Sequence, residues 1–406
     1  MSLNNFSKGK AMSLIKPVLG ILSLFFYLLC ADVVAKDCDF KGVSFTSNFD
    51  AGRLASCEQL SADHYLLTTD AENRPINPSP WYAFKVEPKN AADTQTLTIT
   101  LKAEQAKPRY LPKMSTDGKV WHNLAFTLKD NQVSFEISPT QAVFIAAQEI
   151  IDNEQYRLWM SQIAERSHLS RIQLGYSTLG RPIEGLISQR DQNTEWLLII
   201  GRQHPPEVTG ALALLSFVDE MIEETELQQA FFQRFNLLII PNLNPDGVAA
   251  GNWRHNSKGV DLNRDWGKFT QVETALVKSK LDSLLKDPQR LVFAVDFHST
   301  QQDVFYTMPI DYPVAPRQFT NDWLNAIKEQ SVSSFVVRPK PGSSPGRGVF
   351  KQFIADEYAV HAVTFELGDN TQRELIEHVG QISARSLISQ MLATPPQAFV
   401  FSSVTP

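Results

Sequence analysis

Apolar and polar positions alternate over short runs in the first third of the chain, between Phe40 and about Ser138. Such runs occupy residues 43–47, 65–69, 81–86 and 96–101, and turn residues such as those at 77–80 separate them. Alternation of this kind is typical of half-buried strands. Several short strands at this spacing predict a small antiparallel β-sandwich.

The pattern changes after Thr140. Residues 142–165 carry helical spacing, and continuous apolar runs follow at 195–201, 235–241, 291–297 and 360–365, with an amphipathic helical pattern at 209–224. Near-continuous apolar strands separated by helices indicate a sheet that is covered on both faces. We therefore predict a β-sandwich domain over 36–150 and an α/β domain over 151–400, in which a mixed, mostly parallel sheet is flanked by helices.

The first 35 residues have the layout of a secretory signal peptide. Three lysines precede an apolar run at 17–31, and small residues follow at 33–35. The alternatives are a membrane-anchoring helix, for which the run is near the lower length limit, or a buried helix. A lipoprotein anchor at Cys30 is disfavoured because two bulky leucines precede it. We predict cleavage after Ala35, a periplasmic or secreted protein, and no stable membrane span after cleavage.

Composition and charge narrow the classes further. The 406 residues are 43% hydrophobic and carry a formal charge of −6, so the chain is globular and lacks the basic excess of a nucleic-acid-binding protein. Of the three cysteines, Cys30 lies in the predicted signal. Cys38 and Cys57 remain, and in an exported protein such a pair predicts a disulfide. The alternative is two reduced, buried cysteines.

Polar residues gather where the predicted buried strands end, and ligands collect at the carboxyl ends of strands in open α/β sheets. His204 and Glu207 follow the first strand, and His298 ends the third. A catalytic zinc ion takes three protein ligands and keeps a fourth position for water. These residues therefore predict one zinc ion per chain, although each histidine alone also fits a structural role.

Further polar residues surround this predicted metal site. Glu366 ends the fourth strand in a partly apolar setting and is a candidate general base. Arg254 is placed to stabilise an oxyanion, and Arg264 beside Asn263 suits a planar carboxylate. Asp261 is placed to accept a hydrogen bond from a zinc-bound histidine. A surface salt bridge is the alternative for each arginine.

Several motifs resemble the signature blocks of the zinc carboxypeptidases of the carboxypeptidase A type, and they occur in the family's order. They are Gly180-Arg-Pro-Ile-Glu-Gly185, His204-x-x-Glu207, Asn244-Pro-Asp-Gly247, Gly259-Val-Asp-Leu-Asn-Arg-Asp-Trp266, Phe297-His-Ser299 and Thr364-Phe-Glu-Leu367. Residues 45–165, with the segments 47–53 and 81–84, are similar to the N-terminal domain of the cytosolic carboxypeptidase subfamily.

The resemblance implies a metallocarboxypeptidase that acts on the C-termini of peptides or proteins. It implies that His204, Glu207 and His298 bind zinc and that Glu366 is the general base. It also implies that Arg254 stabilises the oxyanion and that Asn263 and Arg264 hold the terminal carboxylate. Alignment back from Glu366 places Lys351 in the specificity pocket, with Arg347 as a second candidate, and a cation there favours an acidic C-terminal side chain. The alternative for Lys351 is a solvated surface lysine.

The chain departs from the family at one catalytic position. The alignment places Ser344 where the carboxypeptidase A type carries a mobile tyrosine, and Tyr358 is only a weak substitute. Two other functions fit the same sequence. One is an amidase acting on peptidoglycan peptides or N-acyl amino acids, and the other is an inactive binding module whose β-sandwich does the binding.

Overall fold

A computed structural model describes residues 38–73, 77–90 and 95–401. The predicted signal peptide and its alternatives lie outside these residues. Among the described residues, no helix has the length and apolar character needed to cross a membrane.

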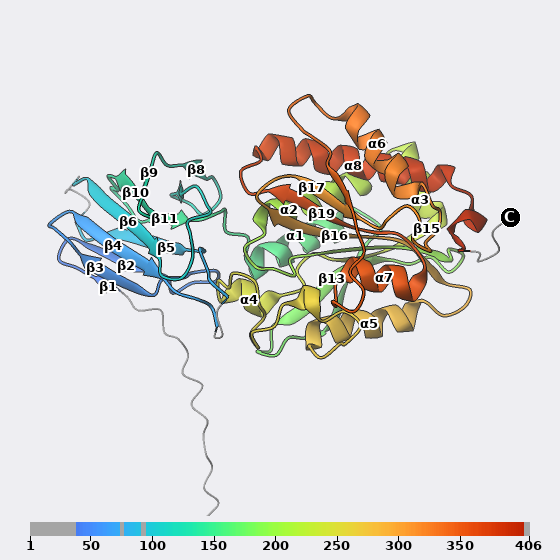
Figure 1. The fold of residues 1–406 in the computed structure, drawn as a ribbon, viewed down its shortest axis with the longest axis horizontal. Coiled ribbons are helices and arrows are strands. Elements are labelled where there is room, and N and C mark those ends of the chain that lie inside the picture. Colours follow the sequence, from blue (N-terminus) through green and yellow to red (C-terminus); the bar gives the residue numbers. More distant parts are fainter. Residues whose placement is uncertain (1–37, 74–76, 91–94, 402–406) are drawn as a thin grey trace, which may run out of the picture. The chain divides into compact units, whose positions relative to one another are not determined.

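The N-terminal region, here called the β-domain, is built from two sheets (Figure 1). The first sheet has the strand order β1 (Cys38–Asp39), β2 (Val43–Thr46), β5 (Ala83–Pro88), β11 (Val143–Ala146), β7 (Lys113–Ser115) and β8 (His122–Asn123). The second has the order β3 (Ser56–Gln59), β4 (His64–Thr69), β6 (Leu97–Ala103), β10 (Gln132–Ile137) and β9 (Thr127–Lys129). The predicted β-sandwich is confirmed, with one difference: β4 and β6 run parallel, because β5 between them in sequence belongs to the other sheet.

Alternating side chains of both sheets form the core of the β-domain. Phe45 and Phe84 from the first sheet and Leu67 and Ile99 from the second are fully buried in one cluster. The predicted disulfide between Cys38 and Cys57 is confirmed, with a Cα–Cα distance of 5.8 Å. It joins β1 of one sheet to β3 of the other, so it connects the two layers covalently.

The C-terminal region, here called the α/β-domain, contains one mixed sheet. Its strand order is β12 (Ser170–Tyr176), β13 (Pro182–Ser188), β15 (Phe235–Ile240), β14 (Glu195–Gly201), β16 (Arg290–Thr300), β19 (Ala362–Gly368), β17 (Val304–Thr307) and β18 (Pro339–Pro341). The four central strands β15, β14, β16 and β19 are mutually parallel. Their carboxyl ends therefore lie along one edge of the sheet, as the sequence pattern predicts.

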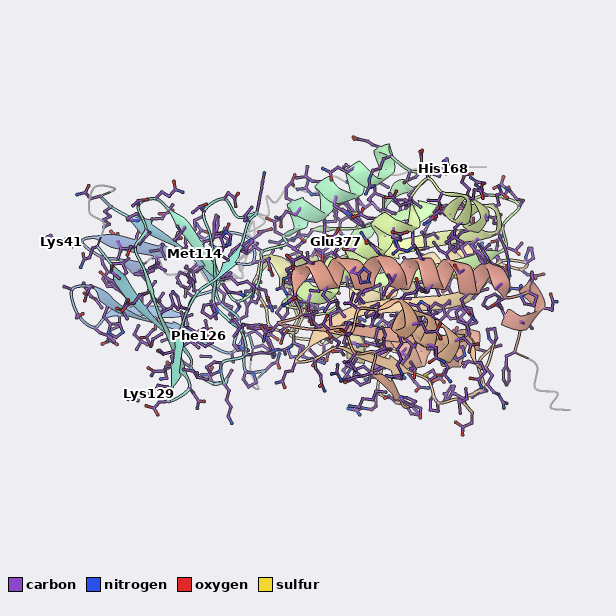
Figure 2. All side chains as sticks on the ribbon, turned by 90° about the horizontal axis from the view of Figure 1, so that it is seen from above. Lys41, Met114, Phe126, Lys129, His168 and Glu377 are labelled. Atoms are coloured by element: carbon purple, nitrogen blue, oxygen red, sulfur yellow. A yellow bond between two sulfur atoms is a disulfide. The ribbon has the colours of Figure 1, made fainter. Side chains whose placement is uncertain are left out.

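Helices cover both faces of this sheet (Figure 1). One hydrophobic cluster joins the sheet to α1 (Asn153–Glu165), α2 (Val208–Met221), α3 (Glu226–Arg234), α6 (Phe319–Gln330) and α8 (Arg373–Ala393). Figure 2 shows α8, which carries Glu377, along one side of this domain. The opposite cluster contains side chains of α5 (Val272–Leu284) and α7 (Phe350–Tyr358). Short helices α4 (Pro245–Ala249), η1 (Leu262–Arg264) and η2 (Pro396–Phe399) complete the chain.

The predicted helical spacing over 142–165 is wrong in its first part. Residues 143–146 form β11, which pairs with β5 and β7, so the apolar positions there belong to a strand. The helix begins later, after Asp152, whose side chain accepts from the backbone N–H of Gln155 while the Gln155 side chain accepts from that of Asp152. This capping box satisfies amide groups that the first turn leaves unpaired.

The two domains share part of their cores. Tyr156 of α1 and Val208 and Ala211 of α2 belong to the hydrophobic cluster of the β-domain. The remaining buried face of α2, including Phe217, belongs to the α/β-domain. Arg373 at the start of α8 forms a bidentate ion pair with Glu149, which follows the last strand of the β-domain.

Candidate active site

The loop between β14 and α2 positions the first two predicted zinc ligands. Arg202 has a left-handed backbone (φ 54°), and its guanidinium donates to the Pro205 carbonyl at 2.7 Å and to the Tyr156 hydroxyl at 2.9 Å. These bonds hold the loop that carries His204, and Glu207 is the N-cap residue of α2.

The start of α2 is fixed against β16, the strand that carries the third predicted ligand. A Cβ atom at Gly210 would lie 2.2 Å from the carbonyl oxygen of His298, so only glycine allows this approach. The Gly210 amide also donates to Ser299 Oγ at 2.8 Å. The structure thereby brings the predicted ligands of the loop next to His298, although His298 lies 94 residues after His204 in the sequence.

The three predicted ligands form a compact cluster. His204 Nδ1 lies 2.8 Å from Glu207 Oε1, and His298 Nδ1 lies 2.7 Å from Glu207 Oε2. One potential ligand atom from each of these three residues lies within 4.8 Å of the other two, and the described residues contain no other such group of His, Cys, Asp or Glu side chains. Burial raises the pKa of Glu207, but the two histidines lower it by more, so it stays ionised.

Each histidine is held by a carboxylate at its other ring nitrogen. His204 Nε2 lies 2.9 Å from Asp261 Oδ1, and His298 Nε2 lies 2.7 Å from Asp296 Oδ2. Two imidazoles and one carboxylate, with outer carboxylates that orient the imidazoles, are the donor set of a catalytic zinc site. The residues therefore fit this metal.

Asp296, which contacts His298, is a residue that the sequence pattern did not single out. It is fully buried in β16, two residues before His298, and its Oδ2 also accepts from Gln203 Nε2 at 2.7 Å. Gln203 is held in turn by the indole N–H of Trp266. Burial raises the pKa of Asp296, and the charge of His298 offsets this only in part. The alternation of the strand, which puts 296 and 298 on one face, is the signal that identifies it.

Glu366 lies in β19 directly opposite His298 in the parallel pairing with β16. It lines the same cavity as the three ligands. Burial, followed by the negative charge of Glu207, raises the pKa of Glu366 to about 7, although His298 and His204 act in the opposite direction. A carboxylate with a raised pKa beside a metal site is suited to accept and release a proton near neutral pH.

The predicted arginines reach the same cavity from the segment before α5. Asp261 caps η1 by accepting from the Asn263 amide at 2.8 Å, and its other oxygen accepts from Arg254 Nε at 2.7 Å. Asn263 Oδ1 accepts from the Phe350 amide at 2.9 Å, which leaves the Asn263 amide nitrogen as the donor at the cavity. Burial lowers the pKa of Arg264, as do the neighbouring Arg254 and Arg347, while Asp261 opposes the shift.

These residues surround one cavity of about 390 Å³. It is lined by His204, Glu207, Arg254, Asn263, Arg264, His298, Ser344, Lys351 and Glu366, and also by Arg109, Thr300, Tyr306 and Thr364. Arg109 and Tyr306 were not predicted as site residues.

Lys351 lies in the first turn of α7 and is buried, with 4% exposure, so the alternative of a solvated surface lysine is wrong. Its ammonium donates to the backbone carbonyls of Thr307, at 3.0 Å, and Gly342. Burial lowers its pKa to about 8. The second specificity candidate, Arg347, is exposed and is absent from the cavity lining.

Tyr358 does not replace the missing mobile tyrosine. Its ring packs against Phe353 in the cluster between the sheet and α5 and α7, and its hydroxyl is buried away from the cavity lining. Ser344 lines the cavity at the aligned position. Among the described residues, the tyrosine in the cavity lining is Tyr306 of β17, which pairs with Thr364 of β19.

The family models agree with this geometry. The zinc carboxypeptidase model matches residues 156–386, which is more than half of the chain. The chain belongs to the zinc carboxypeptidase family. A second model, the cytosolic carboxypeptidase N-terminal domain, matches residues 45–148. Zinc is the metal of this family, and His204, Glu207 and His298 form the site that fits it.

Individual proteins that match the chain are distant in sequence. Mouse cytosolic carboxypeptidase 6 is 25% identical over 293 residues, covering 63% of this chain and 53% of that protein. An uncharacterized protein of Zymomonas mobilis is 25% identical over 265 residues, covering 62% of this chain and 66% of that protein. The matched segments therefore span about half to two thirds of these relatives.

Solved carboxypeptidase structures share the fold over both domains. A metallo-carboxypeptidase from Burkholderia cenocepacia superposes with a TM-score of 0.74 at 20% identity, covering 86% of this chain and 99% of that chain. A metallo-carboxypeptidase from Pseudomonas aeruginosa, in complex with (2-guanidinoethylmercapto)succinic acid, has a TM-score of 0.70 at 20% identity, covering 86% and 98%. The predicted α/β fold with an N-terminal all-β domain is thus confirmed.

Proposed function

We propose that the protein is a zinc-dependent metallocarboxypeptidase that hydrolyses the C-terminal peptide bond of peptides or proteins. The observation that carries the proposal is the content of one cavity. It combines a His-Glu-His metal site, a carboxylate with a raised pKa and the arginines Arg254 and Arg264.

Each group of residues in the cavity has a separate role in the proposed reaction. The Asn263 amide and Arg264 bind the terminal carboxylate of the substrate, since an arginine fork matches a carboxylate. His204, Glu207 and His298 would hold a zinc ion, which would supply a Lewis acid for the scissile carbonyl and for lowering the pKa of a water molecule. Glu366 accepts a proton from the attacking water and passes it to the leaving amine. Arg254, oriented by Asp261, donates to the carbonyl oxygen as negative charge develops on it.

We further propose a preference for acidic C-terminal residues, with Lys351 as the residue that reads the side chain. Lys351 lines the cavity beside the segment that would hold the terminal carboxylate, because Phe350, its neighbour, donates to Asn263. A buried cation is costly unless a negative group pairs with it. Thr307 and Gly342 offer only neutral carbonyls, so a substrate carboxylate would complete the pairing. Arg347 remains a second candidate from outside the cavity lining.

Peptide digestion tests the activity directly. Purified zinc-loaded protein is incubated with peptides that end in Glu, Asp, Leu or Lys, and the released amino acid is quantified. We expect release that is fastest for Glu and Asp and that Glu366→Gln slows by roughly 10²- to 10⁴-fold, because glutamine keeps the shape but cannot accept the proton. If the zinc-loaded protein releases no residue from any of the four peptides, the peptidase assignment is wrong.

We also propose that the protein is exported to the periplasm or secreted. The Cys38–Cys57 disulfide supports this compartment, because structural disulfides persist in oxidising environments. Cell fractionation followed by N-terminal sequencing of the mature protein tests the proposal. A mature chain that retains the lysine-rich start, or that stays in the cytoplasmic fraction, would contradict it.

A further inference from the structure

One residue of the β-domain reaches into the active-site cavity. Arg109 lies between β6 and β7, and within the described chain it is the cavity-lining residue that comes from before α1. The other lining residues begin at His204. The cavity is therefore completed by a domain whose sequence carries no catalytic motif.

The Arg109 guanidinium is held in a fixed orientation. Its Nε donates to Asp369 Oδ2 at 2.6 Å, and its Nη2 donates to Asp369 Oδ1 at 3.1 Å. The plane also lies over the indole ring of Trp253, 4.7 Å from the ring centroid. Asp369 follows β19, and its backbone is fixed by Thr300 and Gln148. An arginine clamped in this way loses little further entropy when it binds another group.

One edge of this guanidinium is left for a ligand. Nη1 makes no hydrogen bond to any described residue, although Nε and Nη2 are both engaged. The side chain is 20% exposed and lines the active-site cavity of about 390 Å³, and also a small pocket of about 20 Å³ in the β-domain. The small pocket has room for about one water molecule, so the active-site cavity is the space that can admit a ligand. A fixed arginine therefore offers two N–H groups of Nη1 to a molecule in the cavity.

Arg109 and the residues proposed to hold the terminal carboxylate come from different segments of the chain and are held by different carboxylates. Arg254, from the segment that leads to Asn263 and Arg264, pairs with Asp261, whereas Arg109 pairs with Asp369 after β19. A peptide with its last residue at Asn263 and Arg264 and its scissile carbonyl at the metal ligands would extend upstream through the rest of this cavity, which Arg109 lines.

We propose that Arg109 binds the backbone carbonyl oxygen one peptide unit upstream of the scissile bond. The inference rests on the proposed carboxypeptidase activity. A neutral carbonyl suits this position better than a carboxylate, because Asp369 already neutralises Arg109 and Glu207 lies nearby. A further carboxylate would place three negative groups around one guanidinium.

Two matched substrates isolate this contact. Benzoyl-glycyl-glutamate carries the upstream carbonyl, and 4-phenylbutanoyl-glutamate replaces that amide by two methylene groups while keeping the same length and the same scissile bond. For the wild type we expect kcat/KM to be roughly 10- to 100-fold higher on the first substrate, which is the strength of a hydrogen bond to a charged group. Arg109→Gln should remove this advantage and change kcat/KM on the second substrate by less than about twofold.

Arg385→Gln is the matched control. Arg385 of α8 also pairs with a carboxylate, with Nη1 to Glu220 Oε2 at 2.7 Å, but it neither lines the cavity nor contacts Asp369. It should leave the ratio between the two substrates unchanged. A merely structural role of Arg109 would instead lower kcat/KM on both substrates equally.

Three results would overturn the inference. They are equal kcat/KM of the wild type on both substrates, a ratio that survives in Arg109→Gln, and an equal loss of the ratio in Arg385→Gln. If Arg109→Gln does not fold, Arg109→Lys is compared instead, because lysine keeps the charge but loses the clamped edge and should also reduce the ratio. Absence of cleavage of both substrates by the wild type would refute the proposed function itself.

Discussion

The pH dependence of specificity should identify the residue that reads the C-terminal side chain. Burial lowers the pKa of Lys351 to about 8, so the ammonium is about 90% charged at pH 7 and about 10% charged at pH 9. We expect kcat/KM on a substrate ending in Glu, divided by kcat/KM on the same substrate ending in Gln, to be constant below pH 7. Above pH 8 this ratio should fall by about tenfold per pH unit until the charge no longer contributes.

The ratio removes the titrations that the two substrates share. Glu366 and the metal site act on the same scissile bond in both substrates, so their pH dependence cancels. The profile of kcat/KM reports groups of the free enzyme, which is the state in which the Lys351 pKa is lowered. The alternative reader, Arg347, would give a flat ratio to about pH 11, because a guanidinium stays charged throughout this range.

Lys351→Met and Arg347→Gln complete the assay. Methionine keeps the length and apolar stem of lysine, and loss of the charge should lower the ratio at pH 7 by roughly 30-fold, the lower end of the cost of breaking a buried charge pair. Arg347→Gln should change it by less than about twofold. The reasoning fails if the wild-type ratio is the same at pH 7 and pH 10, or if Lys351→Met keeps the preference.

The burial of Lys351 should also make the free energy of unfolding depend on pH. Lys351 titrates at about 8 in the folded protein against an ordinary value of 10.5, so between these pH values the unfolded chain binds a proton that the folded chain does not. The free energy of unfolding should therefore rise with pH across this window, by about 3 kcal/mol for the full shift. Urea denaturation at pH 7 and pH 10.5 should show this rise in the wild type relative to Lys351→Met.

Three further changes test the rest of the site and the β-domain. Glu366→Gln should lower kcat by roughly 10²- to 10⁴-fold with full zinc content, and loss of zinc would mean that Glu366 is a ligand. Asp296→Asn should weaken zinc binding by about 10- to 100-fold in competition with a chelator, whereas unchanged affinity would exclude an orienting role for His298. Changing Cys38 and Cys57 to Ser removes a cross-link over a sequence separation of 19 and should lower the free energy of unfolding by about 3 kcal/mol in urea, with kcat/KM unchanged. An unaffected urea midpoint would count against that contribution.

The parts of the fold that were predictable are those with a strong local signal. The run at 195–201 coincides with β14, because a strand that is buried on both faces must be apolar throughout. His204, Glu207, His298 and Glu366 could be placed together because the carboxyl ends of parallel strands meet at one edge. The segment 143–146 was misassigned because its apolar spacing fits a helix and a strand equally, and only pairing with distant strands decides between them.

The residues that were missed depend on long-range geometry. Arg109 lies in another domain, and no periodicity in its neighbourhood relates it to the metal ligands. Asp296 lies within an apolar run, where its role becomes visible only when the face of His298 is known. The burial of Lys351 likewise depends on Thr307 and Gly342, two segments that approach it only in the folded chain.

The packing of helix α2 limits how the two domains could be separated during evolution. The two family matches divide the sequence near residue 150, but α2 packs Val208 and Ala211 into one core and Phe217 into the other. A descendant that lost the β-domain would expose this apolar surface next to Glu207, which occupies the N-cap position of the helix. The two domains are therefore expected to denature in a single cooperative transition, and a lineage could separate them only by redesigning α2 first.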